Sequence, residues 1–497
     1  MNIKKAKEYI KDTVSIYLKR DEYGELDIPV VKQRPIFLLG APGVGKTAIM
    51  EQVASELNIA LCSYAMTHHT RQSALGLPVI KDKVYGGITT QVTEYTMSEI
   101  IASIYNVIEE SGISEGILFL DEINCVSETL APSMLQFLQY KEFGNHRIPD
   151  GWVVVTAGNP PEFNKQVREF DVVVMDRLKV IEVEPEYSAF REYAYDRNVH
   201  PAIISFLDIK KEYFYLIENT VKGRSYVTAR GWEDLSQILL RYEEAGLSVD
   251  ETLIEQYIRN TKVVKEFAAY YDIYKKYKRD YGVEDIFDGK YSAQSVEKAS
   301  KASFDERLSL LGILMDGVLK SMKESVVKGD NLSELAKVLK VVIGKSQENG
   351  FELYDELMNI IAGKRKQLLS LDKAGISTTD SRKTAGFVIS FIENEAKKVS
   401  LGDGDITSIK ADYNDMVIKA RQQAEEVSNT LHNVFDFVAK AFEKGNEMLI
   451  FVTNLTVNEY ASVYLTRFPS DDYNNYRKEM MIEERNDSIS AMIDEVL

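Results

Sequence analysis

Eight residues near the start of the chain, Gly40 to Thr47, have the types and spacing that hold a chain of phosphates. They read GAPGVGKT, which fits G-x-x-x-x-G-K-S/T, and they follow the apolar run 36–39. Glycines let the backbone curve around an anion with its N–H groups inward, and the helix that follows adds positive potential. The Lys46 ammonium can reach β- and γ-phosphates, and the Thr47 hydroxyl can ligate Mg²⁺. An ordinary glycine turn before a helix does not need Lys-Thr after its last glycine. We therefore predict that the nucleotide-binding residues are Gly40, Ala41, Pro42, Gly43, Val44, Gly45, Lys46, Thr47 and Ala48.

A pair of carboxylates follows a second apolar run, residues 116–120. Asp121 and Glu122 stand where a buried strand ends. Asp121 can hold Mg²⁺ through water, and Glu122 can polarise a water molecule that attacks a γ-phosphate. Adjacent carboxylates can also cap the helix that follows them. Because a phosphate-binding loop lies upstream, we predict that Thr47 and Asp121 are metal ligands and that Glu122 is catalytic.

Three further polar residues follow the phosphate-binding loop and the acidic pair in the sequence. Asn159 follows the apolar run 153–157, where a neutral amide can orient the attacking water and contact a γ-phosphate without adding charge. Asn-Pro alone is a common turn. The prediction for Asn159 therefore depends on its position in the sequence, after the phosphate-binding loop and the acidic pair. Arg177 and Arg230 come later, and a guanidinium neutralises phosphate charge in phosphoryl transfer. Either arginine alone is more often a surface residue. Their spacing after Asn159 predicts a catalytic role for all three.

The front part of the chain alternates short apolar runs with helical patterns, which indicates an α/β fold. We expect strands at residues 35–39, 59–64, 116–120, 153–157 and 180–183. We expect helices between and after them, at residues 47–57, 97–110, 129–138, 187–196 and 230–245.

The rest of the chain predicts helices throughout. Ten of the 11 prolines lie at or before Pro201, and none occurs from residue 202 to 468. Amphipathic helices are expected, for example, at residues 305–320, 331–343, 351–366 and 412–444, with glycine-bearing breaks at 328–330 and 401–405. Tyrosines interleaved with lysines between residues 257 and 281 fit either a nucleic-acid surface or a packed core covered by lysine stems. The acidic balance of the chain favours the core.

Composition narrows the class of protein. A chain of 497 residues is too long for one core, and 45% hydrophobic with 28% charged residues is typical of a globular protein. The net charge of −17 argues against general binding to nucleic acid or anionic membranes. The N-terminus lacks the apolar core of a signal peptide, and no apolar run reaches 18 residues. Cys62 and Cys125 lie in apolar segments, so we expect buried, reduced thiols and a cytoplasmic location.

The motifs together resemble those of AAA+ ATPases, most closely the MoxR-like and dynein-related group, over about residues 35–240. Residues 40–47 match Walker A, 118–124 match Walker B, and Asn159 matches sensor 1. Arg177, in Asp-Arg-hydrophobic context, is similar to the arginine finger, and Arg230 is similar to sensor 2. Residues 144–152 resemble the hairpin before the sensor strand, residues 75–78 the insert in the second helix, and 200–201 the start of the lid. Residues 67–71 differ from the polar residues common after the second strand, which leaves open what contacts Glu122 there.

The resemblance implies a P-loop NTPase αβα core with an AAA+ helical lid. The chain beyond about residue 247 lies outside the resemblance, and its helical patterns predict a large all-α C-terminal domain. The expected division is an N-terminal helical segment (1–32), the nucleotide-binding core (33–186), the lid (187–246) and a C-terminal domain (247–497). The resemblance also implies a homo-oligomeric ring, usually a hexamer, that binds ATP and Mg²⁺ between subunits, with Arg177 reaching into the neighbour's site. Its partners would be proteins, among them von Willebrand factor A domain proteins.

The function that the resemblance implies is Mg²⁺-dependent ATP hydrolysis that remodels, activates or matures a partner protein, a chaperone-type activity. Two alternatives stay open. One is a nucleic-acid-directed NTPase of the restriction or mobile-element type, and the other is an ATP-gated assembly protein with little turnover. His68-His69 has no metal-site spacing around it, so these two residues are expected to be polar loop residues.

Overall fold

The computed structural model describes residues 1–479, except for residues 69–70, 144–145, 164–166, 198, 221–222, 347–350 and 444. The chain divides into two compact units, which are considered separately. Unit 1 contains residues 1–186 together with 358–393, and unit 2 contains residues 187–357 and 394 onward. The four-part domain division that the sequence suggests stays a prediction. No helix in the described part of the chain is long and apolar enough to cross a membrane.

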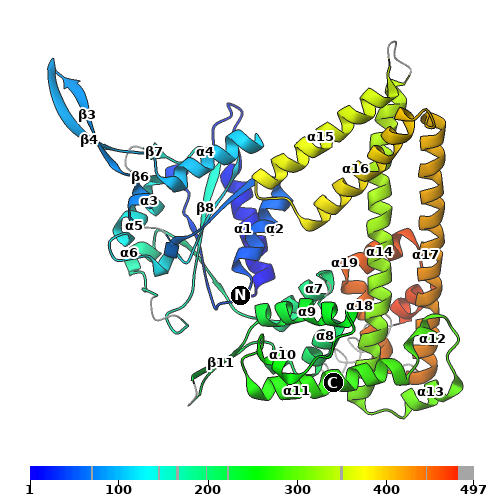
Figure 1. The fold of residues 1–497 in the computed structure, drawn as a ribbon. Helices are drawn as coiled ribbons and strands as arrows, with labels where there is room; N and C mark the ends of the chain where they lie inside the picture. The colour runs from blue at the N-terminus through cyan, green and yellow to red at the C-terminus, as the bar shows by residue number, and fades with distance from the viewer. Residues whose placement is uncertain are drawn as a thin grey trace, which may run out of the picture. The chain divides into compact units, whose positions relative to one another are not determined.

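Unit 1 is built on a parallel sheet of five strands in the order β2-β5-β8-β1-β9 (Figure 1). The strands are β1 (Ile36–Gly40), β2 (Ala60–Ala65), β5 (Gly116–Asp121), β8 (Trp152–Gly158) and β9 (Lys179–Val183). Each lies within one residue of the run that the sequence predicts. The three inner strands β5, β8 and β1 are almost wholly buried, which is why they read as continuous apolar runs without alternation. The α/β core predicted from the sequence is therefore confirmed.

Helices link and cover these strands. They are α1 (Ile3–Leu18), α2 (Lys46–Leu57), α3 (Arg71–Leu75), α4 (Glu99–Ser111), α5 (Ala131–Tyr140) and α6 (Val172–Met175). The N-terminal helix α1 packs on α2, where Lys7 and Lys11 both form ion pairs with Glu56. The Met1 amino group also donates to the Glu182 carbonyl of β9, so the start of the chain is fixed against the sheet.

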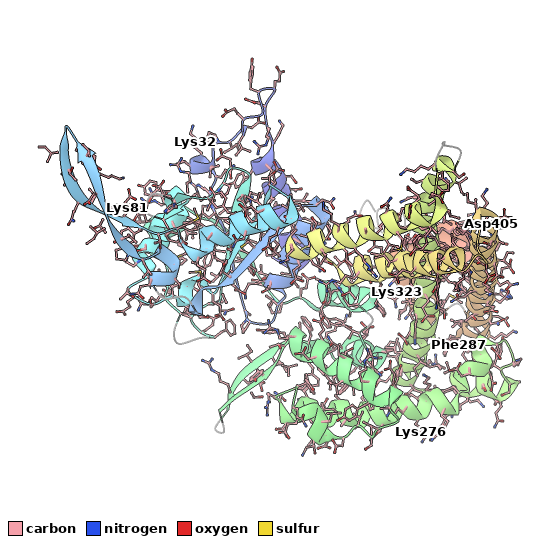
Figure 2. The ribbon with its side chains drawn as sticks, turned by 45° about the horizontal axis from the view of Figure 1, so that its top comes forward. Lys32, Lys81, Lys276, Phe287, Lys323 and Asp405 are labelled. Carbon is pink, nitrogen blue, oxygen red and sulfur yellow. The ribbon has the colours of Figure 1, made fainter. Side chains whose placement is uncertain are left out.

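Two hairpins lie outside the main sheet. One is a short pair, β6 (Glu142–Phe143) with β7 (His146–Arg147), whose connecting residues 144–145 lie outside the described residues. The other is a long ribbon, β3 (Pro78–Tyr85) with β4 (Ile88–Tyr95), in which no residue is buried. Figures 1 and 2 show this ribbon extending away from the sheet, with Lys81 on it. The resemblance of residues 144–152 to a hairpin overlaps the short pair, and residues 75–78, which resemble the insert in the second helix, lead into the long ribbon.

A segment from far along the sequence completes unit 1. Helices α15 (Leu353–Lys373) and α16 (Thr379–Ser400) meet in a tight turn, and this turn lies against the edge strand β2. The Leu61 N–H donates to the Ala374 carbonyl over 2.8 Å, and Lys373 pairs with Glu110 at 2.8 Å. A free strand edge invites pairing with other chains, so this turn protects part of the edge.

Unit 2 is largely helical. Its helices are α7 (Tyr187–Asp196), α8 (Pro201–Ile209), α9 (Ala229–Glu244), α10 (Glu251–Glu255), α11 (Thr261–Asp280), α12 (Val283–Phe287), α13 (Ala293–Ser300), α14 (Phe304–Lys345), α17 (Ile406–Phe442), α18 (Asn446–Val457) and α19 (Glu459–Arg467). A hairpin, β10 (Leu216–Thr220) with β11 (Gly223–Val227), precedes α9. One hydrophobic core runs from Phe190 to Tyr473, so the segments predicted as lid and C-terminal domain share it. Tyr271, Tyr274 and Tyr281 are buried in this core, which confirms the packing interpretation of the tyrosine cluster.

One predicted break in unit 2 is wrong. The sequence predicts that residues 328–330 separate two helices, but they lie inside α14, a single helix of 42 residues. A glycine inside a helix costs about 1 kcal/mol relative to alanine, so tertiary contacts must offset it here. Val326 and Leu332 are buried on either side, and Asp330 accepts a hydrogen bond from Arg467 of α19 at 2.7 Å. Figure 1 shows the long helices α14 and α17 side by side, in agreement with their packing.

A buried polar group sits inside the unit 2 core. The His200 Nδ1 accepts from the Ala202 N–H at the start of α8, so its Nε2 carries the proton that faces Glu243, 3.2 Å away. Burial acts to raise the pKa of Glu243, but the hydrogen bonds from His200 and Tyr271 lower it to about 2. Asp316 lies near this group, and burial raises its pKa to about 6 against the attraction of Lys320 and Lys278.

The raised pKa of Asp316 predicts a pH-dependent stability. Its carboxyl is neutral in the folded protein below about pH 6 and charged above it, whereas in the unfolded chain it ionises near its usual value of 3.8. The folded state therefore loses about 3 kcal/mol as pH rises from 3.8 through 6. Asp316→Asn is expected to raise the thermal midpoint above pH 6, with the gain fading toward pH 4. Exposed Asp234→Asn is the control, and an equal gain at all pH values would contradict the assignment.

The docking of residues 374–376 depends on a glycine. Gly375 has φ +70°, and a Cβ there would lie 2.7 Å from the Leu61 carbonyl oxygen. Gly375→Ala is expected to release the turn, so that the Leu61 amide exchanges its hydrogen faster. Gly386→Ala, which meets open space, should leave this exchange unchanged. Leu61 protection that survives Gly375→Ala, measured by hydrogen exchange, would show that the contact does not depend on the glycine.

Candidate functional site

The polar residues singled out in unit 1 gather at one edge of the sheet. The loop 41–45 follows β1, and Asn159 follows β8. Asp121 is the last residue of β5, and Glu122 comes directly after it. Thr67 lies just after the neighbouring strand β2. Because the strands are parallel, their carboxyl ends meet at the same edge, where open α/β sheets bind ligands.

The glycine-rich loop has the backbone that an anion cradle needs. Gly43 has φ +76° and Gly45 has φ +94°, a region that residues with a side chain rarely adopt. Gly45 is the N-cap of α2, so the free N–H groups of that helix begin at Lys46. At Gly40 a Cβ would lie 2.7 Å from the Val183 carbonyl oxygen, so close packing of β1 and β9 requires this glycine.

Lys46 links the glycine-rich loop to the residue that follows strand β8. Its side chain is buried, and its Nζ donates to the carbonyls of Gly40 at 2.7 Å and Ala41 at 3.0 Å. The same Nζ donates to Asn159 Oδ1 at 2.9 Å. The structure thus brings together Lys46 and Asn159, which are 113 residues apart in the sequence.

Thr47 and Asp121 are also adjacent. The Thr47 hydroxyl donates to Asp121 Oδ2 at 3.1 Å, and Asp121 Oδ1 accepts from the Glu122 N–H at 2.8 Å. A hydroxyl beside a carboxylate supplies the oxygen ligands that Mg²⁺ prefers, so these residues fit that ion. No group of three or more His, Cys, Asp or Glu residues among the described residues is placed to hold a metal. The ion would therefore need water and ligand oxygens as well. Of the His68-His69 pair, His69 lies outside the described residues.

Glu122 is held in a constrained position. Its φ of +55° is uncommon for a residue with a side chain and costs on the order of 1 kcal/mol. The Thr67 hydroxyl donates to Glu122 Oε2 at 2.9 Å, and the Cys125 N–H donates to the Glu122 carbonyl. The sequence leaves open which residue of 67–71 contacts Glu122, and in the structure Thr67 does. Thr67 lies two residues after the end of β2, and no local pattern distinguishes it from the other polar residues of that segment.

The two arginines belong to different units. Arg177 follows α6 in unit 1 and is exposed, and no described residue pairs with its guanidinium. Arg230 is exposed in the first turn of α9 and belongs to unit 2. Within unit 1, Arg177 forms no hydrogen bond with the described residues around Lys46, and the catalytic roles of both arginines stay predictions.

A parallel five-stranded sheet, a glycine-rich loop between β1 and α2, and an acidic pair after an inner strand together define a P-loop nucleotide-binding domain. Residues 35–178 match the family described as AAA domain, dynein-related subfamily. This segment is therefore an AAA+ domain of the dynein-related group, as its motifs suggested. A search of curated proteins finds no match to the chain.

Removal of the Lys46 ammonium tests the assigned loop. Lys46→Ala takes away the one side-chain cation that the loop presents at the end of β1, and we expect loss of ADP and ATP binding by at least about 100-fold. Exposed Lys32→Ala is the control and should bind as the wild type does. Isothermal titration measures both, and tight ATP binding by Lys46→Ala would refute the loop as the phosphate site.

Proposed function

We propose that this protein is an Mg²⁺-dependent ATPase, an AAA+ motor that remodels, activates or matures a partner protein. The observation that carries the proposal is the contact of Lys46 Nζ with Asn159 Oδ1 at 2.9 Å, beside Thr47, Asp121 and Glu122. It supports the proposal because it unites a phosphate-binding cation, a neutral amide, a set of metal-ligating oxygens and a carboxylate base at one edge.

The side chains divide the chemistry among them. Lys46 and the N–H groups of the loop would bind the phosphates, and Thr47 and Asp121 would hold Mg²⁺, which neutralises phosphate charge when bound. Glu122 would accept a proton from the attacking water, with the Thr67 hydroxyl fixing one carboxylate oxygen and leaving the other for the water. The Asn159 amide would orient that water and contact the γ-phosphate. The products are ADP and inorganic phosphate.

A ring is the assembly proposed, usually of six subunits, because Arg177 is exposed and unpaired among the described residues. An arginine of this kind can neutralise transition-state charge in a neighbouring subunit's site. Arg230 would act from the lid of the same subunit as Lys46. The cargo is proposed to be a protein, with von Willebrand factor A domain proteins as one class, since a net charge of −17 disfavours nucleic acid.

Glu122→Gln tests the base. The amide keeps the shape of the side chain but cannot accept the proton of water, so we expect turnover to fall by at least about 100-fold while ATP still binds. Exposed Glu51→Gln on α2 should hydrolyse ATP at the wild-type rate. Phosphate release in the steady state is the measurement, and normal turnover by Glu122→Gln would exclude this role.

Mixing two inactive variants tests the ring. Arg177→Ala keeps its own Glu122, and Glu122→Gln keeps Arg177, so a mixed ring contains sites with both groups. Random mixing at equal amounts should restore about a quarter of the wild-type rate, because a head-to-tail interface pairs each site with one neighbour. Either variant alone should remain inactive. A mixture no more active than its parts would mean that Arg177 does not act in a neighbour's site.

A further inference from the structure

Asn124 has no assigned role, yet it connects three segments around the site. It lies in the short turn Ile123–Cys125 directly after Glu122 and is only 4% exposed. Its Nδ2 donates to the Asn159 carbonyl at 2.8 Å, and its own carbonyl accepts from the Arg168 N–H at 2.9 Å. One residue therefore joins the turn after β5, the end of β8 and the chain that leads toward Arg177.

The amide plane of Asn124 is fixed by close packing on Gly158. A Cβ at Gly158 would lie 2.5 Å from Asn124 Oδ1, 2.7 Å from its Cγ and 2.9 Å from its Nδ2. Any larger residue at 158 would therefore displace the amide. The orientation of the amide follows from chemistry, since only the NH₂ group can donate to a carbonyl oxygen.

The same residue carries an unfavourable feature. Asn124 Oδ1 is buried and accepts no hydrogen bond from any described group. A buried acceptor without a donor destabilises a fold, and an apolar side chain would avoid that penalty. Packing alone therefore does not account for an asparagine here. What an apolar residue cannot supply is the donated hydrogen bond to the Asn159 carbonyl.

We propose that Asn124 is a positioning residue for ATP hydrolysis, which holds the main chain of Asn159 so that its side chain meets Lys46 and the γ-phosphate. Pro160 already restricts the backbone of Asn159 to extended conformations, and the hydrogen bond from Asn124 fixes it further. Because Glu122 and Asn124 share one turn, the hydrogen bond from Asn124 also fixes the position of the Asn159 side chain relative to the Glu122 carboxylate. This inference rests on the function proposed above.

The first test compares Asn124→Ala and Asn124→Asp. Misplacement of a reacting group by about 1 Å lowers a rate by about 100-fold, so we expect kcat of Asn124→Ala to fall by about 10- to 100-fold, with the ADP dissociation constant little changed. Asn124→Asp has the same shape but donates only when its carboxyl is protonated. Its rate relative to wild type should rise at least about 5-fold from pH 8.5 to 5.5, while the relative rate of Asn124→Ala stays flat. Parallel pH profiles for the two variants would overturn the proposal, because a purely structural role does not depend on that proton.

A double-mutant cycle gives a second test that does not rely on Asn124 variants alone. Gly158→Ala is expected to displace the amide and to lower kcat as Asn124→Ala does. In the Asn124→Ala background the added methyl group has room, so Gly158→Ala should have little further effect. Equal and independent losses in both backgrounds would overturn the proposal.

Wild-type turnover separates this inference from the proposed function. If the wild type hydrolyses ATP and Asn124→Ala does so equally well, only the positioning role fails. If the wild type shows no turnover, the proposed hydrolysis fails, and the affinity ratio of a non-hydrolysable ATP analogue to ADP decides about Asn124. A lower ratio in Asn124→Ala supports the contact between Asn159 and the γ-phosphate, and an unchanged ratio overturns it. Absence of nucleotide binding by the wild type overturns both.

Discussion

The ammonium group of Lys46 is the point on which the candidate site depends. It is buried, and it joins the end of β1 to the residue that follows β8 through hydrogen bonds to Gly40, Ala41 and Asn159. These contacts require β1 and β8 to be neighbours, which the strand order provides. Parallel pairing then brings β5 alongside β8 and places its carboxylates at the same edge. The sheet thus sets the geometry of the site, and the loop supplies its charge.

Much of this could be predicted because the residues involved are consecutive or follow apolar runs. Gly40 to Thr47 form one uninterrupted motif, and Asp121, Glu122 and Asn159 each stand where an apolar run ends. Asn124 and Thr67 could not be assigned roles in this way. Their hydrogen bonds cross between strands that are far apart in sequence, and no local pattern distinguishes them from other polar turn residues.

In the helical segments beyond residue 247, prediction from the sequence fails where tertiary contacts override local preferences. Glycine and aspartate at 329–330 locally favour a break, but buried neighbours and the pairing of Asp330 with Arg467 keep α14 continuous. The membership of residues 358–393 in unit 1 is likewise a tertiary property. It rests on a backbone hydrogen bond from Leu61 to Ala374 and on the small size of Gly375, neither of which has a periodic signature.

The central claim is that this site hydrolyses ATP and is completed between subunits. The ATPase rate per subunit, measured over a wide range of protein concentration, tests it most directly. We expect a rate per subunit that rises with concentration and levels off as rings form, because each active site would then gain its neighbour's arginine. A rate that stays at the uncatalysed background at every concentration would contradict hydrolysis, and a constant rate well above background would contradict sites shared between subunits.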